Sequence, residues 1–450
     1  MIISVPPKVL QACTVLKGHG FQAYLVGGAV RDSLLGLAPT DWDIATDALP
    51  DQVENLFPTS IPTGKRFGTI TVLVEGLPIE VTTMRSDGPY SDQRRPDYIV
   101  YTDRLELDLA RRDFTINALG YDPFTKRLID PFQGRRHLRR RILATVGEPA
   151  ARFQEDPLRM LRLVRFQATL GFRVHRETEK ALPKLAHLMA KVSPERILAE
   201  LNKMLVGQEL LTALHTFYTG TLMEQVLPEL ASLAGLSAGA NHPYDLLTHL
   251  CTAAHFAPPQ LALRWAALLH DLGKKQSLGR DHAQLSAELA QDILRRLRAS
   301  TELINQVSTL IAHHMFSVHP HSSDRALRRF LGQVGVETAR SLIKLRQADM
   351  AGMNVPPREI IAFGQALEGR IQEILDQENA LSLKDLRLDG RQLLDALQLK
   401  PGPLVGEILN YLLERVWEEP ELNQTATLLA LARDYLQSPK EKGAEQPPSS

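Results

Sequence analysis

The stretch from residue 25 to residue 46, LVGGAVRDSLLGLAPTDWDIAT, constrains the fold more than any other part of the chain. A short apolar run ends in two glycines, a helix-like segment with Arg31 follows, and Asp41 and Asp43 precede a second apolar run. This order predicts a strand, a glycine turn, a helix and a second strand. Residues two apart on a strand point to the same face, so the two carboxylates would present paired oxygens on one side.

These residue types suit a site for a metal ion and a phosphorylated ligand. Paired carboxylate oxygens are what a hard divalent cation such as magnesium requires. Glycines such as Gly28 let backbone amides approach a phosphate closely, and Arg31 would add a charge-assisted contact. A DxD pair or a glycine pair alone is typical of a solvated turn. Their occurrence together, in this order, favours a site.

The two motifs GGAVRD and DWDIAT resemble the head of the DNA-polymerase-beta-like nucleotidyltransferases. More narrowly, they are similar to the class II CCA-adding tRNA nucleotidyltransferases and the bacterial poly(A) polymerases. The resemblance implies that Asp41 and Asp43 are catalytic and hold Mg²⁺. It also implies a third acidic residue on a neighbouring strand, for which Glu80 is the candidate. A surface strand carboxylate is the alternative for Glu80.

Length and composition bound the possibilities further. The chain has 450 residues, of which 44% are hydrophobic, and this length fits about two to four domains. It contains no apolar run of the roughly 20 residues that a membrane helix needs, and no secretory leader is evident, so we expect no membrane partner. Two cysteines, Cys13 and Cys251, give no disulfide framework and suit a reducing cytoplasm.

Charge is informative only locally, because basic and acidic residues number 52 each. Five arginines fall within residues 135–141, and arginine recurs at every third position from Arg159 to Arg165. These clusters fit a protein that holds RNA on one face. An ordinary solvated arginine-rich helix is the alternative.

The hydrophobic periodicity predicts an α+β protein: a small head with a mixed sheet, then an all-helical neck, body and tail. A hairpin is expected over residues 68–83, followed by a long polar loop over 84–102. From about residue 148, apolar residues recur three and four apart, which indicates helices. The expected parts are residues 1–147 (head), 148–234 (neck), 235–360 (body), 361–437 (tail) and 438–450 (disordered).

A second motif, Arg111-Arg112-Asp113, is expected on a helix that starts near residue 107. It matches a motif of the same family. The resemblance implies that the arginines hold a nucleotide triphosphate and that Asp113 accepts a hydrogen bond from a ribose hydroxyl, which would favour ribonucleotides. The alternative is an exposed helix turn with salt bridges.

The third motif lies in RFQEDPLRMLRLVRFQ, residues 152–167. On one helix, Asp156, Arg159 and Arg162 would share a face. Alternatively, Asp156 caps this helix, with Pro157 at the first helical position. The two roles of Asp156 compete, since a carboxylate aimed at its own helix cannot also aim at a base.

The base-reading alternative rests on hydrogen-bond chemistry. A carboxylate only accepts hydrogen bonds and an arginine only donates them. Cytosine and adenine each offer an amine donor beside a ring-nitrogen acceptor, whereas uracil and guanine offer the reverse order. An Asp–Arg pair would therefore accept C and A and reject U and G without a nucleic-acid template, because an unpaired buried polar group costs about 1–3 kcal/mol.

This stretch resembles the EDxxR motif of the class II family, in which the protein acts as the template. The residues that the resemblance assigns to nucleotide binding are Gly28, Arg31, Arg112, Asp113, Asp156, Arg159, Arg162 and Arg165.

Histidine and aspartate residues form a spaced series in the second half of the chain. His249, the adjacent pair His270-Asp271, and Asp349 fall on expected helical segments, with His282 and His313-His314 between them. The order resembles the HD phosphohydrolases. It implies an HD-type body in which His249, His270, Asp271 and Asp349 bind a transition metal such as Ni²⁺ or Mn²⁺. The alternative is a helical RNA-binding body in which the histidines only pack.

The resemblance implies template-independent addition of CCA to the 3′ end of tRNA, from CTP and ATP, by two-metal nucleotidyl transfer in the cytoplasm. The HD-type body would hydrolyse phosphoesters on RNA ends. A poly(A) polymerase, or an enzyme that adds only CC or A, is the near alternative. A metal-dependent phosphohydrolase whose head binds RNA is the distant one. The oligomeric state stays open.

Overall fold

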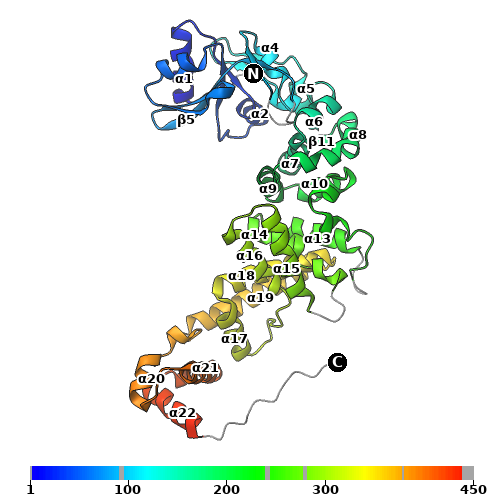
Figure 1. Cartoon of the computed structure of the whole chain (residues 1–450). Coiled ribbons are helices and arrows are strands. Elements are labelled where there is room, and N and C mark those ends of the chain that lie inside the picture. Colours follow the sequence, from blue (N-terminus) through cyan, green and yellow to red (C-terminus); the bar gives the residue numbers. More distant parts are fainter. Residues whose placement is uncertain (1–2, 91–95, 239–243, 277–280, 378–379, 438–450) are drawn as a thin grey trace.

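The computed structural model describes the chain except residues 1–2, 91–95, 239–243, 277–280, 378–379 and 438–450. The segment expected to be disordered therefore lies outside the described residues. The expected α+β class is confirmed, with a mixed sheet at one end of an elongated molecule and helices through the rest (Figure 1). Among the described residues, no helix combines the length and the apolar character needed to cross a membrane.

The head is built on a seven-stranded mixed sheet. Its order is β3 (Ser60–Gly64), β4 (Thr69–Val74), β5 (Leu77–Thr83), β2 (Asp43–Thr46), β1 (Tyr24–Val26), β8 (Gly120–Asp122) and β9 (Arg127–Ile129). β2 and β5 run parallel, and the other neighbouring strands run antiparallel. The predicted hairpin is confirmed as β4 and β5, in which alternate residues are buried as a half-buried sheet requires.

Helices cover this sheet and join its strands. They are α1 (Pro7–Gly18), α2 (Gly28–Leu35), α3 (Pro50–Leu56), α4 (Leu105–Ala110) and α5 (Gly134–Arg140). The predicted strand, glycine turn, helix and strand are β1, Gly27, α2 and β2. One part of that prediction is wrong: Asp41 precedes β2, so only Asp43 lies on the strand.

Three further predictions need correction. The polar loop is not wholly irregular, because its ends pair as β6 (Arg85–Asp87) and β7 (Ile99–Tyr101). The helix expected from residue 107 to residue 119 ends at Ala110, so the second motif lies in the turn after α4 and before a 3₁₀ turn at Thr115–Asn117. Strand pairing also continues past residue 148, since β10 (Ile142–Leu143) pairs with β11 (Arg173–Val174).

The neck consists of α6 (Pro149–Glu155), α7 (Leu158–Leu170), α8 (Arg176–Leu185), α9 (Pro194–Leu205), α10 (Leu210–Thr219), α11 (Leu222–Val226) and α12 (Pro228–Ala231). Asp156 does not share a helix with Arg159 and Arg162, because α6 ends before Asp156 and α7 begins after Pro157. The alternative, in which Asp156 caps a helix that starts beside Pro157, is confirmed to within one residue. Asp156 has extended backbone angles, φ −146° and ψ 100°. The ring of a proline disfavours a helical conformation in the residue before it, which accounts for the break.

The body contains α13 (Leu246–Phe256), α14 (Leu261–Leu269), α15 (His282–Arg296), α16 (Thr301–Ala312), α17 (Asp324–Val334), α18 (Val336–Gly352) and α19 (Pro357–Asp376). α13 packs against both α14 and α18. Trp265 on α14 is fully buried, and its Nε1 donates to Asn202 Oδ1 on α9 at 2.9 Å, which ties the body to the neck.

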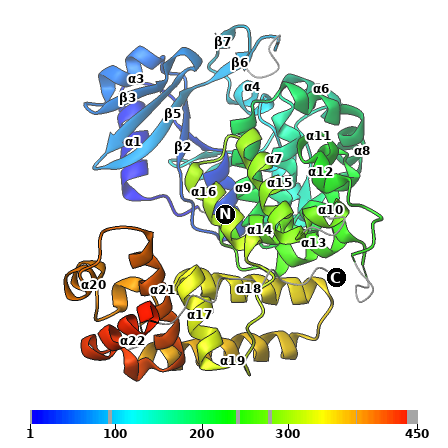
Figure 2. The ribbon, with the colours of Figure 1, turned by 60° about the horizontal axis from the view of Figure 1, so that its bottom comes forward.

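The last helices, α20 (Gly390–Leu397), α21 (Pro403–Glu418) and α22 (Thr425–Gln437), bury a small core of their own. α21 lies beside α17, where Arg328 donates to the carbonyl of Trp417 at 3.1 Å (Figure 2). α19 runs through residue 360, where the sequence places the boundary between body and tail. Shorter 3₁₀ segments are Lys65–Phe67, Ala186–Lys191, Leu272–Lys275, Leu383–Asp385 and Pro420–Leu422.

Candidate functional site

A cavity of about 470 Å³ lies where the head meets the neck. The glycine turn before α2, the turn after α4, and helices α7 and α9 contribute its walls. The lining includes every residue that the sequence assigned to nucleotide binding: Gly28, Arg31, Arg112, Asp113, Asp156, Arg159, Arg162 and Arg165. Residues more than a hundred positions apart therefore come together as the family resemblance implies.

The glycine turn is required by the close approach of two side chains. Gly27 has φ +73°, and a Cβ built there would lie 2.6 Å from Nη1 of Arg112 and 3.3 Å from Oδ2 of Asp43. A side chain at this position would therefore be strained and would also collide with Arg112. Because Gly27 has no side chain, the guanidinium of Arg112 can approach the carboxylate of Asp43.

Asp43 lines this cavity, and the carboxylates of Asp41 and Glu80 are close enough to Asp43 to interact with it electrostatically. Asp43 and Glu80 are register partners in the parallel pair β2–β5, so their side chains leave the same face of the sheet. Burial raises the pKa of Asp43, Arg112 acts against this, and Asp41 raises it again. Burial, Asp43 and Asp41 all raise the pKa of Glu80. This mutual repulsion of oxygens fits a divalent cation, which would relieve it.

The phenyl ring of Phe166 lies close to three of the arginines that line the cavity. The guanidinium carbons of Arg31, Arg162 and Arg165 lie 5.1, 5.8 and 3.9 Å from the ring centroid of Phe166. Glu200 on α9 lies 2.7 Å from Nε of Arg165. Stacking on an aromatic ring and pairing with a buried carboxylate hold these arginines in place, which suits binding of a triphosphate.

Asp113 is buried and nearly saturated with hydrogen bonds. Arg162 donates to Oδ2 at 2.8 Å, while the backbone N–H of Phe114 and the amide of Asn117 donate to Oδ1 at 2.8 and 3.0 Å. Burial alone would raise the pKa of Asp113, but Arg162 and these hydrogen bonds lower it to about 2. The group is therefore an anion, and a ribose hydroxyl would have to share or replace one of these bonds.

The two oxygens of Asp156 serve different partners. Oδ1 accepts from the backbone N–H of Leu158 at 3.2 Å, as a helix cap does, whereas Oδ2 pairs with Arg196 at 2.8 Å. The capping contact is therefore confirmed, and base reading by Asp156 stays a prediction. One oxygen fixes the carboxylate to the start of α7, and the other lies at the cavity wall.

Arg159 is fixed on the same wall and is only 8% exposed. Its Nη1 donates to Glu155 at 2.7 Å and to the carbonyl of Arg152 at 3.3 Å, and its Nη2 donates to the carbonyl of Arg111 at 3.2 Å. The guanidinium has five N–H groups, so donors remain for a ligand. A carboxylate and a guanidinium thus line one cavity, each held by other residues.

Sequence reasoning missed the residues that support this pair. Arg196 and Glu200 stand one turn apart on α9 and reach Asp156 and Arg165 respectively. Asn117 joins two of the motifs, because Arg31 donates to its Oδ1 at 2.7 Å while its amide donates to Asp113. Only the spacing of charges in ERILAE, residues 195–200, gave any signal for the α9 pair.

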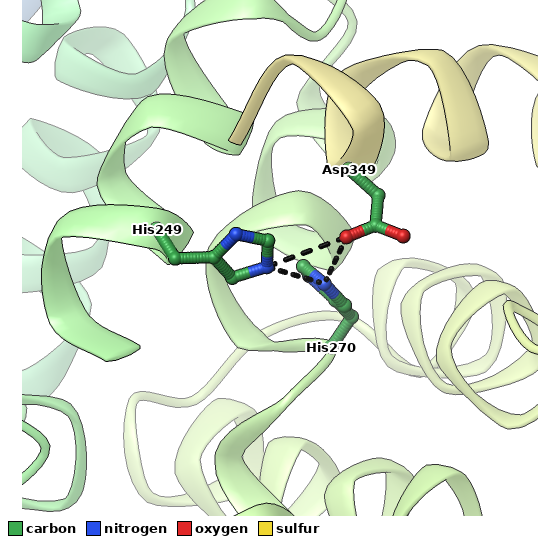
Figure 3. Close-up of side chains that lie close together, drawn as sticks. All are labelled: His249, His270 and Asp349. Carbon is green, nitrogen blue, oxygen red and sulfur yellow. Dashed lines mark hydrogen bonds and ion pairs between the residues drawn. The ribbon is translucent and has the colours of Figure 1, made fainter. Parts of the chain in front are cut away.

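The predicted HD cluster also converges, far from the head cavity along the chain. Nε2 of His249 lies 3.3 Å from Nε2 of His270, and Oδ1 of Asp349 lies 3.3 and 3.4 Å from these two nitrogens (Figure 3). Helices α13, the end of α14, and α18 supply these three residues. Oδ2 of Asp271 lies 3.5 and 3.4 Å from the same nitrogens.

The chemistry of this donor set fits a metal ion. Nδ1 of His270 lies 2.9 Å from the carbonyl of Ala267, and the carbonyl accepts a proton carried by Nδ1. The lone pair of Nε2 then faces two carboxylates, which only accept. Burial works against a charge on His249, but Asp271 and Asp349 raise its pKa to about 9, so this centre attracts positive charge. Nitrogen and carboxylate ligands of this kind suit divalent transition metals.

Comparisons with known proteins agree with the geometry. Three family models match: the poly A polymerase head domain over residues 23–144, a probable RNA- and SrmB-binding site of polymerase A over 171–233, and a putative tRNA nucleotidyltransferase domain 2 over 278–432. The CCA-adding enzyme of Geobacillus thermodenitrificans is 36% identical over 401 residues, which is 88% of each chain.

Two further relatives extend over nearly the whole chain. The CCA-adding enzyme of Lactococcus lactis subsp. cremoris is 33% identical over 97% of this chain and 99% of its own length. The solved structure of the Bacillus stearothermophilus CCA-adding enzyme in complex with CTP superposes with a TM-score of 0.76, at 30% identity, over 96% of this chain and 98% of that one. The chain is a nucleotidyltransferase and belongs to the family of CCA-adding enzymes.

Proposed function

We propose that this protein adds C, C and A in turn to the 3′ end of tRNA, using CTP and ATP and no nucleic-acid template. The observation that carries the proposal is the position of Asp156 and Arg159 on one wall of the arginine-lined cavity that Asp43 borders. Its relatives are CCA-adding enzymes, and one of them has been solved with CTP. Two free, buried cysteines are consistent with work in the cytoplasm.

In the proposed reaction the 3′-oxygen of tRNA attacks the α-phosphorus of the nucleotide. A P–O bond to the tRNA forms, the bond from the α-phosphorus to the bridging oxygen breaks, pyrophosphate leaves, and the hydroxyl proton passes to solvent. Mg²⁺ held by Asp41 and Asp43, with Glu80 beside them, would supply Lewis-acid activation of the hydroxyl and neutralise the leaving group. No covalent enzyme intermediate is needed.

The residues of this chain bind and orient the nucleotide. Arg31, Arg112, Arg162 and Arg165 would bind the triphosphate, and the absence of a side chain at Gly28 leaves the start of α2 open to a phosphate. Asp113 would take up the ribose hydroxyl. Because Phe166, Glu200 and Asn117 already hold these groups, little ordering remains when the nucleotide binds.

Selection of the base follows from the donors and acceptors of two side chains. Oδ2 of Asp156 would accept the exocyclic amine of cytosine or adenine, and Arg159 would donate to the neighbouring ring nitrogen. Uracil and guanine would present a carbonyl acceptor to the carboxylate of Asp156 and an N–H donor to Arg159, so neither hydrogen bond could form. The same pair therefore serves both nucleotides, and the change from C to A must come from elsewhere in the complex.

The test uses purified protein, Mg²⁺ and tRNA transcripts that lack CCA, CA or A. Each nucleotide is supplied alone and then with the others, and the 3′ ends are sequenced. We expect CTP to extend the first two substrates, ATP to extend the third, and CTP with ATP to complete CCA. Long A tracts would instead identify a poly(A) polymerase. Products that end at CC would identify an enzyme that adds only CC, and extension only of tRNA that already ends in CC would identify an enzyme that adds only A.

A second activity is favoured by the convergence of His249, His270, Asp271 and Asp349. We propose that this cluster binds Ni²⁺ or Mn²⁺, which would supply an activated water for phosphoester hydrolysis. The substrate would be a 2′,3′-cyclic phosphate or a 3′-phosphate at a damaged tRNA end. Water adds to phosphorus and the bond to a ribose oxygen breaks, so hydrolysis of a 3′-phosphate leaves the free 3′-hydroxyl that the head extends.

The double change His270→Ala, Asp271→Ala tests this activity. We expect it to remove hydrolysis of cyclic and terminal phosphates by protein loaded with Ni²⁺, Mn²⁺ or Co²⁺, and to spare CCA addition in Mg²⁺. Wild-type protein that retains no transition metal and hydrolyses neither ester would contradict the proposal. CCA addition by the same preparation would show that the protein is folded.

A further inference from the structure

The body holds a buried arginine that has no carboxylate partner among the described residues. Arg264 lies early in α14 and is 5% exposed. We propose that its guanidinium, the imidazole of His255 and the start of α14 form a binding site for a small free oxyanion of the phosphate class. This site lies outside the metal cluster proposed for the body. It depends neither on that cluster nor on nucleotide addition by the head.

The hydrogen bonds of this guanidinium are incomplete. Among the described residues its one hydrogen bond runs from Nε to the carbonyl of Pro258, at 3.3 Å. Nη1 is buried and has no partner there. Burial also lowers the pKa of Arg264. A guanidinium has five N–H groups, and an unpaired buried donor is destabilising, so a ligand that accepts hydrogen bonds would stabilise this side chain.

A second buried arginine of the body shows how such a group is ordinarily held. Arg328 is also 5% exposed, but its Nη1 donates to the carbonyl of Trp417 and its Nη2 to Gln377, both at 3.1 Å. Its Nη2 also lies 3.5 Å from Asp324. Arg264 has no comparable set of partners in the described part of the chain, although buried charges are ordinarily paired. A bound anion would supply the partner that Arg264 lacks.

The side chain of Arg264 lies over the start of its own helix. Side chains on a helix tilt toward its N-terminus, and the bond to Pro258 places Nε beside a residue that precedes α14. Gln260, the N-cap of α14, makes no side-chain hydrogen bond to the first turn. The N–H groups of a first turn have no partner within the helix, and the helix dipole there favours a bound anion. The guanidinium and the helix therefore favour the same kind of ligand.

His255, in the last turn of α13, adds a further donor. Its Nδ1 is buried and has no hydrogen-bond partner among the described residues. Burial and the charge of Arg264 lower the pKa of His255, whereas Glu209 raises it. A neutral imidazole carries its proton on one ring nitrogen, so an N–H at Nδ1 can donate to an oxyanion that Arg264 also holds.

Glu209 and a water molecule are the competing partners. Glu209 is exposed, and its side chain lies against Gly171, where a Cβ would be 3.1 Å from Cγ of Glu209. Solvent and salt screen the charge of an exposed carboxylate. A water molecule could bond to both Arg264 and His255, but it would leave the charge of the buried guanidinium unbalanced. A bound oxyanion supplies both the hydrogen bonds and the opposite charge.

The position of the site favours a small ligand. Nη1 of Arg264 and Nδ1 of His255 are both buried, so a free oxyanion reaches them more readily than a phosphodiester fixed in an RNA helix. Pro258 is half-buried, and Phe256 beside His255 is 61% exposed, so the site lies just beneath the surface. Phosphate offers several acceptor oxygens, which suits a guanidinium and further donors around it.

The test follows the ¹³Cε1–¹H NMR signals of the histidines in the full chain, and His255→Gln assigns the signal of His255. Inorganic phosphate is added at constant ionic strength, with chloride as the reference. We expect phosphate to raise the pKa of His255 by about 1, because a nearby anion favours the charged imidazole. Arg264→Met should abolish this rise, and Arg264→Lys, which keeps the charge, should retain part of it. The other histidine signals report whether each variant is folded.

Two further arms separate the explanations. Glu209→Gln changes an exposed residue and should preserve the response to phosphate, so its loss in that variant would overturn the proposal. tRNA lacking CCA, added in place of phosphate, should leave the pKa of His255 unchanged. A rise caused by tRNA and not by phosphate would assign the site to RNA and overturn the free-anion proposal. An absent response to phosphate in the wild-type protein, or an equal response in Arg264→Met, would also overturn it.

Discussion

At the scale of single residues, the proposed selection of the base depends on how Asp156 and Arg159 are held. A carboxylate that used both oxygens to cap α7 could not read a base, and a freely rotating arginine would not discriminate between bases. Asp156 caps with one oxygen and pairs with Arg196 through the other. Arg159 is fixed by Glu155 and two backbone carbonyls. The sequence indicated that Asp156 and Arg159 act together, but it did not indicate which residues hold them in place.

Replacing Arg159 tests whether it reads the base. We expect Arg159→Ala to lower the preference for C and A over U and G by about ten- to a hundredfold, because the 1–3 kcal/mol penalty for a mismatched donor or acceptor is lost. Binding of the triphosphate should change less. Incorporation of all four nucleotides, measured in separate reactions, checks this. An unchanged preference would mean that Arg159 only supports the turn between α6 and α7.

Replacing Arg196 tests whether it positions Asp156. We expect Arg196→Met to reduce kcat/KM for CTP and ATP by about tenfold and to narrow the difference from UTP, since a misplaced reading group loses both rate and selectivity. Arg196→Lys should restore part of the selectivity. Arg295→Met, an exposed arginine on α15, is the control. Equal losses for all four nucleotides would point to a general structural role instead.

At the scale of elements, the order of strands and helices in the head was predictable, but several side-chain positions were not. The alternation over residues 69–83 gave the hairpin, and the glycine pair gave the turn. The sequence did not reveal that β2 pairs in parallel with β5, which brings Glu80 beside Asp43. Two other strands, β3 and β4, lie between β2 and β5 in the chain, so local periodicity carries no information about this pairing.

Other elements were mispredicted for local reasons. Asp156 does not share a helix with Arg159 and Arg162, because Pro157 forces Asp156 out of helical geometry. β10 and β11 have two residues each and lie about thirty positions apart in the chain. A two-residue strand is too short to show the alternation of apolar and polar residues that predicts a strand. In the body, His313 and His314 could not be told apart in sequence, and only the inward direction of His314 at the end of α16 separates them.

The turn before α2 provides the prediction for this scale. Gly27→Ala would place a Cβ 2.6 Å from Arg112 at a backbone angle of +73°, so it must displace the guanidinium that lies beside Asp43. We expect a loss of about a hundredfold in nucleotide addition with little change in tRNA binding. Gly36→Ala is the control, because Gly36 also has a positive φ, +75°, but opens onto free space. Similar losses in both variants would attribute the effect to backbone strain alone.

At the scale of the molecule, the structure separates two centres along an elongated chain (Figure 1). The head cavity is rich in arginine and bordered by carboxylates, whereas the body cluster is made of imidazoles and carboxylates that are buried among helices. The first suits Mg²⁺ and a triphosphate, and the second suits a transition metal. Basic clusters on exposed surfaces, such as Arg135, Arg139 and Arg140 on α5, would supply RNA affinity separately from either centre.

The most direct test of the account compares 3′-end sequences of tRNA lacking CCA after incubation with CTP, ATP and Mg²⁺. We expect wild-type protein and the His270→Ala, Asp271→Ala variant to produce CCA ends. Asp43→Asn should bind the tRNA with similar affinity but extend it slower by about three orders of magnitude, because its metal position is lost. CCA ends formed by Asp43→Asn at a near-normal rate would contradict the account.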